Sequence, residues 1–417
     1  MKEIIKVESK RVLKSQMFIV FLVSVILLSI SSSFQAVKSY ELWDEGGFVA
    51  SGWENLKHGK ENAGNRSIED AIATRRGQEE AVFVDETNIE KLVALNYQDK
   101  TAGELSDGEI NLFFENRLRT IERRLDENIN VDYTESEKER FMKEAEKLTS
   151  LTVGFSEGWK VLNRDMGSFI VIILVMISII IMPLFADETQ TRMQELSRSA
   201  MKGKKQLNFA RIITAYGMGS ILYIFAVLLC FFIKMMPFGF SGANELIQSS
   251  ENTFFSVFHI SYMQQFIWNC LRGYVSLIFM VSLTMLISVM LEQIMAGIAA
   301  ICFYWGLLLI MNQMISFEVN HMFANFMPLR LAGSIDFYNR NELYRFAGRT
   351  FDSIVWCPVV ALILSIGMAV LAMWQLHRKT SEGASSLVIY GRWKNCWNNK
   401  NRGHGGCCAL YLCGKWK

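Results

Sequence analysis

The side chains that most often carry enzyme chemistry are scattered along this 417-residue sequence. Its five histidines stand far apart, and none lies in the H-E-x-x-H pattern that places two zinc ligands on one helix face. No segment matches G-x-x-x-x-G-K-[ST], the loop that wraps its backbone around nucleotide phosphates. Glu79 and Glu80 are adjacent acids, but Arg75 and Arg76 nearby favour a solvated surface over a catalytic pair. We therefore expect no catalytic residue, no metal site and no cofactor-binding site in this chain.

A different kind of site is indicated between residues 183 and 216, which read PLFADETQTRMQELSRSAMKGKKQLNFARIITAY. Met193, Leu196 and Ala200 recur at spacings of three and four, which places them on one face of a short helix. A basic Gly-Lys-Lys turn follows, from Gly203 to Lys205. Such a helix could dock in a groove on a cytoplasmic partner, or it could lie on anionic lipid. The residues alone leave both interpretations open.

The chain on both sides of this segment is rich in apolar residues. Hydrophobic residues make up 51% of the chain, charged residues only 20%, and the mean hydropathy is +0.19, whereas soluble proteins are about a quarter charged. Six apolar segments have about the 20 residues that a helix needs to cross a hydrocarbon core of about 30 Å. None alternates with the period of two that marks a barrel strand. The six segments are residues 17–34, 167–185, 212–233, 268–291, 294–315 and 354–376.

This pattern predicts an all-α polytopic membrane protein with six transmembrane helices and a large, mainly helical extracellular insert between spans one and two. A cytosolic enzyme and a secreted disulfide scaffold are excluded, and the net charge of +2 indicates no nucleic-acid partner. The predicted domains are an N-terminal amphipathic leader with the first span (1–34), the insert (35–166), a five-span domain with a cytoplasmic loop at 186–211 (167–379), and a basic Cys- and Gly-rich cytoplasmic tail (380–417).

The distribution of lysine and arginine predicts that both termini lie in the cytoplasm. Basic residues gather in the first 14 residues, in the 186–211 loop and directly after span six. Arg330, Arg340, Arg345 and Arg349 oppose this arrangement, because the loop after span five is then expected outside. The six-span arrangement is kept, since reversing that loop would leave the basic cluster after span six outside.

The leader resembles a signal peptide in its basic start and apolar centre, but it lacks a suitable cleavage site, so an uncleaved first span is expected. Its apolar residues could lay it along the inner membrane surface, or it could be an ordinary charged flank. In the spans, Arg272 is expected near the outer end of span four and Glu292 in the turn before span five. No central Asp, Glu or Lys is predicted, which disfavours transport driven by protons or sodium. Ala215 with Gly219, and Ala296 with Ala300, have the spacing that allows helices to approach closely.

Two sequence signals in the insert predict the start of a helix. Ser106 with Glu109, and Thr134 with Glu137, have capping-box spacing. After the first start, an apolar stripe at helical period indicates a packed face. The stripe consists of Ile110, Phe114, Leu118, Ile121 and Leu125.

The tail carries four of the eight cysteines. With His404 they could supply zinc ligands, but no C-x-x-C pair is present, and a basic, disordered tail on the inner leaflet is the favoured interpretation. The four cysteines are Cys396, Cys407, Cys408 and Cys413.

The loop between spans two and three resembles that of bacterial ATP-binding-cassette permeases of the type-2 exporter class. In that family an acid just past span two is followed by a short helix, a serine pair, a glycine with basic residues and an Ala-Lys that opens span three. The residues at those positions are Glu188, Ser199, Gly203, Lys204, Lys205, Ala210 and Arg211, the last in place of lysine. Ala200 replaces the second serine, and Thr191-Arg192-Met193 stands where Thr-Gly-Thr is usual.

The resemblance implies a non-enzymatic permease subunit of the bacterial cell membrane that exports an unidentified substrate. Two copies, or one copy and a sister permease, would form the passage, while separate ATPase subunits bind and hydrolyse ATP. The residues that the resemblance places against the ATPase are Glu188, Arg192, Met193, Leu196, Ser199, Ala200, Gly203, Lys204 and Lys205. Two alternatives remain: a membrane-anchored sensor whose insert captures a ligand, and a membrane-embedded hydrolase.

Overall fold

The computed structural model describes residues 1–44, 47–62, 64–77, 83–98, 100–127, 133–190, 203–291, 293–313, 323–333, 335–339, 342–346 and 349–400. Within these residues, six helices are long and apolar enough to cross a membrane, so the chain is a multi-pass membrane protein. They are α2 (Gln16–Lys38), α9 (Glu157–Ile181), α12 (Gly203–Phe238), α13 (Tyr262–Leu291), α14 (Ile294–Gln313) and the first part of α17 (Ser353–Lys400). Each overlaps one of the six predicted spans, which confirms their number and order among the described residues.

Several of these helices extend beyond the apolar segments that predicted them. Helix α9 begins ten residues before residue 167, at Glu157, and α12 continues past residue 233 to Phe238. Hydropathy detects only the apolar part of a helix. The added turns pack against the rest of the protein and can therefore carry polar and charged side chains.

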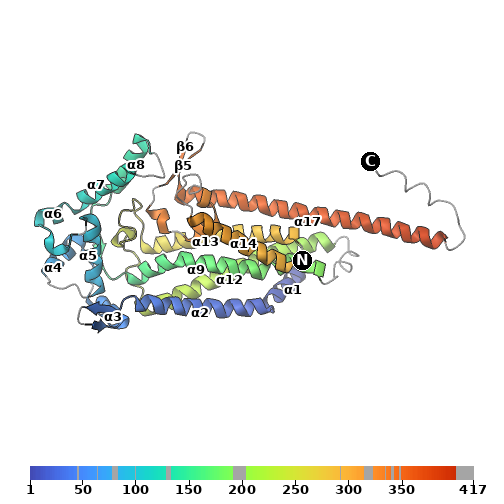
Figure 1. Cartoon of the computed structure of the whole chain (residues 1–417), viewed down its shortest axis with the longest axis horizontal. Coiled ribbons are helices and arrows are strands. Elements are labelled where there is room, and N and C mark those ends of the chain that lie inside the picture. Colours follow the sequence, from blue (N-terminus) through green and yellow to red (C-terminus); the bar gives the residue numbers. More distant parts are fainter. Residues whose placement is uncertain are drawn as a thin grey trace.

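Helices α9 and α13 form the centre of the bundle (Figure 1). About two thirds of α9 and over half of α13 are buried, whereas α2, α14 and α17 are mostly exposed, as expected for lipid-facing helices. At Ala215 and Gly219, whose spacing allows a close approach, α12 lies against neighbouring helices. Ala215 is buried, and a Cβ on Gly219 would lie 3.3 Å from Ile181 of α9. Near the second pair, Ala296 and Ala300, the residue in close contact is instead Gly297, which lies against Met182.

Helix α1 (Lys2–Leu13) lies at one end of the bundle, and the domain that contains the insert lies at the opposite end (Figure 1). We call this second domain the outer domain. The insert supplies most of the outer domain. Its helices are α3 (Gly52–Asn62), α4 (Ile68–Arg76), α5 (Val84–Asn96), η1 (Ala102–Glu104), α6 (Asp107–Asn111), α7 (Phe113–Asp126) and α8 (Glu135–Ala145). Two short antiparallel ladders join them: β1 (Leu42–Asp44) with β2 (Gly47–Ala50), and β3 (Arg66–Ser67) with β4 (Thr152–Val153).

The two predicted capping boxes are confirmed at Ser106 and Thr134. The predicted apolar stripe is only partly correct, because the helix breaks at Leu112 and restarts as α7. From that point every fourth residue is buried, and the set includes a charged side chain, Arg117. Phe114 and Leu118, expected at the centre of the packed face, are only half-buried. A stripe defined by apolar type cannot include an arginine, so the sequence pattern missed the true face.

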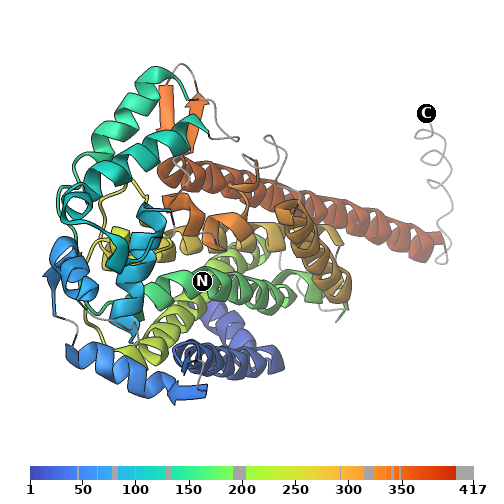
Figure 2. The same cartoon turned by 60° about the vertical axis from the view of Figure 1, so that its left-hand side comes forward.

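Two loops between spans complete the outer domain (Figure 2). One follows α12 and contains η2 (Ile247–Ser249). The other follows α14 and contains α16 (Pro328–Gly333), η3 (Ile335–Tyr338) and the hairpin β5 (Leu343–Phe346) with β6 (Arg349–Asp352). These loops contribute to one apolar core with the insert through Phe254, Phe255, Val257 and Leu343.

The C-terminal segment differs from the expected disordered tail. Helix α17 continues past the apolar span, which ends at Leu376, and runs to Lys400. The rest of the tail, with His404 and the last three cysteines, lies outside the described residues. The zinc alternative depends on those side chains.

Candidate functional site

The predicted partner-binding loop emerges from the end of the bundle where α1 lies (Figure 1). After α9 the chain turns at Met182 into α10 (Pro183–Gln190). The Ser288 hydroxyl of α13 donates to the Met182 carbonyl at 3.0 Å. Gly297 of α14 lies against the Met182 side chain, and a Cβ there would lie 2.6 Å from the Met182 sulfur. The start of the loop is thus held against two further spans.

The nine predicted contact residues divide into two groups. Glu188 lies on α10, and Gly203, Lys204 and Lys205 form the first turn of α12. Helix α10 contacts α12, so the two ends of the loop leave the bundle close together. The remaining five residues lie outside the described residues, namely Arg192, Met193, Leu196, Ser199 and Ala200.

The structure adds a charged pair that sequence reasoning missed. Arg211 Nε lies 3.1 Å from Glu8 Oε1, and both side chains are 8% exposed. Arg11 also approaches Glu8, at 3.6 Å. Val12, one turn after Glu8, is buried in the main core of the bundle. The one available signal was the spacing of four that puts Glu8 and Val12 on the same helix face. It did not reveal the partner, which lies 203 residues further along the chain.

This pair fastens α1 to the start of span three. Charged side chains are buried at this depth only when paired, because an isolated charge loses its hydration. Helix α1 is therefore attached to the bundle beside the loop, whereas the sequence left open whether it was an ordinary charged flank. The sequence identified Arg211 only as the residue that opens span three. In the structure it is the partner of Glu8 that holds α1 to the bundle.

A second charge pair, with a buried lysine, lies toward the other end of the bundle. Lys234 of α12 is 1% exposed and pairs with Asp165 of α9. Both residues lie just outside the predicted spans. The prediction that the span centres contain no Asp, Glu or Lys therefore did not include them. The longer helices bring these two residues into the packed part of the bundle.

Arg272 of α13 is also buried, ten residues after the start of its helix. This depth corresponds to about 15 Å along the helix axis, which is further inside than the sequence indicated. Its Nη2 donates to Asn269 Oδ1 at 2.5 Å, and its guanidinium lies 4.5 Å from the centre of the Phe337 ring. Amide and aromatic groups thus stabilise this cation.

Of the four arginines that oppose the predicted arrangement, Arg345 pairs with the insert and Arg330 is held within its own loop. Arg345 Nη2 lies 2.6 Å from Glu137 Oε2, and this pairing lowers the pKa of Glu137 to about 2. Arg330 is buried and donates to Asn325 Oδ1 at 3.1 Å. Arg349 is exposed on β6, and Arg340 lies outside the described residues. The loop therefore contacts the acidic insert through Arg345.

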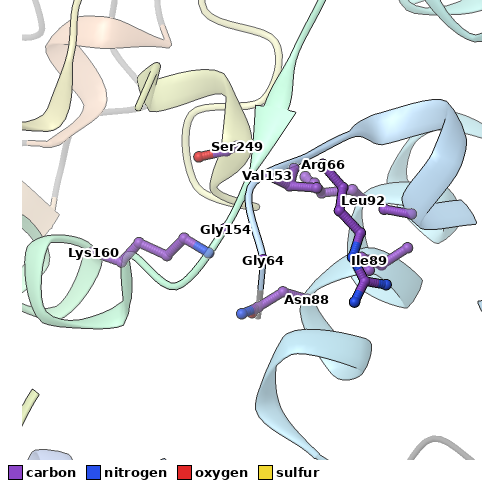
Figure 3. Close-up of a pocket in the computed structure, with 10 residues that line it drawn as sticks. Gly64, Arg66, Asn88, Ile89, Leu92, Val153, Gly154, Lys160 and Ser249 are labelled. Carbon is purple, nitrogen blue, oxygen red and sulfur yellow. The ribbon is translucent and has the colours of Figure 1, made fainter. Parts of the chain in front are cut away.

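The junction between the insert and α9 is organised around one carboxylate. Glu157 accepts hydrogen bonds from the Tyr40 hydroxyl at 2.5 Å and from Asn88 Nδ2 at 2.6 Å, and Lys160 lies 2.9 Å away. The cavity beside it, which Asn88 and Lys160 line, has a volume of about 50 Å³ (Figure 3). A cavity of this size holds a few water molecules at most.

No group of three or more metal-ligating side chains is present among the described residues. Glu79 and Glu80, the adjacent acids of the insert, lie outside those residues. The sequence matches no family model, no curated protein and no solved structure.

Proposed function

We propose that this chain is the membrane-spanning permease subunit of an ATP-binding-cassette exporter. A separate ATPase subunit would hydrolyse ATP and bind the loop between α10 and α12. A second permease copy or a sister permease would complete the passage. The chain itself would contribute no catalytic residue.

The observation that carries the proposal is the attachment of the predicted loop to several spans at once. Its start is held to α13 by the Ser288–Met182 hydrogen bond and to α14 by the contact at Gly297. Its end continues into α12, which the Glu8–Arg211 pair joins to α1. A partner that displaced this loop would therefore move several spans together, because packed helices transmit displacement as rigid bodies.

The proposal is tested by purifying the full chain in mild detergent and identifying the proteins that remain bound. Recovery of an ATPase subunit with a phosphate-binding loop is expected. Recovery without any nucleotide-binding partner would favour the sensor alternative.

The sharper test is Leu196→Asp, which places a charge on the predicted apolar face of the loop helix. We expect it to abolish stimulation of the partner's ATPase activity while membrane insertion is retained. Leu112→Asp is the matched control, because Leu112 is an exposed leucine of the outer domain. Normal stimulation in the Leu196→Asp variant would contradict the assignment of the loop.

A further inference from the structure

A groove lies between α2 and α9, in the half of the bundle nearest the outer domain. Its volume is about 300 Å³, which is within the range of ligand sites in proteins. One wall is a stripe of α2 whose members are three or four residues apart, and the other wall is a stripe of α9. The residues that line it are Leu28, Ser32, Gln35, Ala36, Ser39, Arg164, Asp165, Ser168, Phe169 and Ile172.

The polarity of the groove changes along its length. Gln35 and Ser39 of α2 lie beside Arg164 of α9 at the end nearest the outer domain. The lining toward the other end is more apolar and includes Leu28, Phe169 and Ile172, with Ser32 and Ser168 between the two ends. The polar ends of the two stripes coincide because the two helices are antiparallel. From Leu28 to Ser39 the groove extends about 16 Å along α2, close to the thickness of one leaflet's hydrocarbon layer.

The charges at the polar end do not cancel. Asp165 pairs with the buried Lys234 and also with Arg164, whose Nε lies 2.9 Å from Asp165 Oδ1. Two cations thus share one carboxylate. Arg164 is 48% exposed, and this is the one hydrogen bond that it makes among the described residues. Its guanidinium therefore has donors available for an anion, and arginine binds phosphate oxygens with charge-assisted hydrogen bonds.

The hairpin β1–β2 marks the level of this polar end relative to the membrane. It begins three residues after Ser39 and exposes Trp43 and Phe48, and Trp53 is exposed in the first turn of the following helix, α3. Trp43 and Phe48 pack edge to face, with their ring centres 5.4 Å apart. Exposed tryptophan beside the end of a span is typical of the bilayer interface. The polar end of the groove therefore lies at the height of lipid headgroups.

We propose that the groove between α2 and α9 is a binding site for an anionic phospholipid. The phosphate binds at Arg164, the remaining headgroup contacts Gln35 and Ser39, and an acyl chain lies along Phe169 and Ile172. This inference does not depend on the ATPase partner, so it can be tested on the purified chain alone.

The first experiment places the full chain in nanodiscs that contain a phosphatidylglycerol with a photoactivatable acyl chain, followed by peptide mapping. Labelling is expected in residues 28–39 and 164–172, above that of segment 355–363 of α17, where Val355, Val359 and Ile363 are exposed. Unlabelled phosphatidylglycerol should compete, whereas phosphatidylcholine should compete weakly. Uniform labelling of the lipid-facing helices, or equal competition by both lipids, would overturn the proposal.

The second experiment compares variants by the same competition measurement. Arg164→Ala should weaken phosphatidylglycerol competition about tenfold, as expected for loss of a charge-assisted hydrogen bond, and Arg164→Lys should retain most of it. Ile172→Trp should block the acyl end and reduce labelling, while Ile363→Trp, at an exposed position of α17, should not. Elution as a single species in gel filtration checks folding. Unchanged binding in both Arg164→Ala and Ile172→Trp would reject the site.

Discussion

At the scale of single residues, the bundle holds its charges by pairing side chains from distant parts of the chain. Glu8 with Arg211 and Asp165 with Lys234 are 203 and 69 residues apart in sequence. Each pair joins two helices, because the buried members, Glu8, Arg211 and Lys234, would be charged in the interior at a large desolvation cost without a partner. The charges therefore specify which helices are neighbours in a bundle whose other contacts are largely apolar.

Neutralising Glu8 tests this role. We expect Glu8→Gln to lower the free energy of unfolding by about 3 kcal/mol, since it leaves the buried Arg211 without its carboxylate. Glu3→Gln changes an exposed acid on the same helix and should have little effect. The measurement is detergent-induced unfolding of the purified chain, with Arg211→Gln and the double variant completing a cycle. A coupling energy near zero would show that the pair does not hold α1 in place.

The Glu137–Arg345 pair predicts a response to acid. The arginine depresses the pKa of Glu137 from 4.5 to about 2, so the pair stabilises the protein above pH 4.5. This contribution is lost as the pH falls through that interval, because the unfolded state takes up the proton first. Hydrogen exchange in β5 and β6, corrected for intrinsic rates, should therefore rise between pH 5 and pH 2.5. Glu137→Gln should reduce the additional rise, and an identical pH profile in that variant would refute the assignment.

At the scale of elements, close helix packing depends on glycines at the points where backbones meet. The clearest case is Gly167 of α9, where a Cβ would lie 2.4 Å from the carbonyl oxygen of Gly333 at the end of α16. The obstructing atoms belong to the backbone, so no side-chain rotation can relieve the contact. Gly217 of α12 differs, because a Cβ there would meet nothing within 4 Å.

These two glycines form a matched pair of tests. Gly167→Ala should destabilise the protein by about 1–3 kcal/mol, because it forces α9 and α16 apart. Gly217→Ala should be neutral or slightly stabilising, since alanine favours a helix by about 1 kcal/mol over glycine. Thermal unfolding midpoints of the two variants in the same detergent provide the comparison. Equal midpoints would mean that the contact between α9 and α16 is not tight.

At the scale of the whole molecule, the outer domain is assembled from three separate parts of the chain. Arg117 of the insert donates to the carbonyls of Phe254 and Ser256, at 2.9 and 2.7 Å, in the loop that follows α12. Burial of this guanidinium lowers its pKa to about 10. Arg140 also pairs with Asp352 of β6, at 2.7 Å. The domain therefore forms one unit with the loops of the spans.

This organisation predicts that residues 40–156 alone do not fold stably. The fragment lacks four apolar side chains of the shared core, Phe254, Phe255, Val257 and Leu343. At about 2 kcal/mol each they contribute about 8 kcal/mol, which is comparable to the whole stability of a small domain. Chemical denaturation followed by circular dichroism should show no cooperative transition. Linking residues 244–260 to the fragment should partly restore it, and a cooperative transition in the fragment alone would contradict this account.

The sequence by itself determined the membrane character, the six spans and the helix starts at Ser106 and Thr134. These features follow from local patterns, because the length of an apolar segment and a capping box each act within one stretch of chain. The sequence also pointed to the loop at 186–211, through spacing and resemblance, as the place where a partner would bind.

Only the tertiary structure decided which charges are paired, where helices touch and how the outer domain is composed. Arg211 was visible as a basic residue at a span end, but its partner Glu8 could not be identified, since no local pattern links positions 203 residues apart. The groove between α2 and α9 was hidden for the same reason. Each of its walls is an ordinary helix stripe, and its polarity gradient exists only because two antiparallel helices bring their polar ends together.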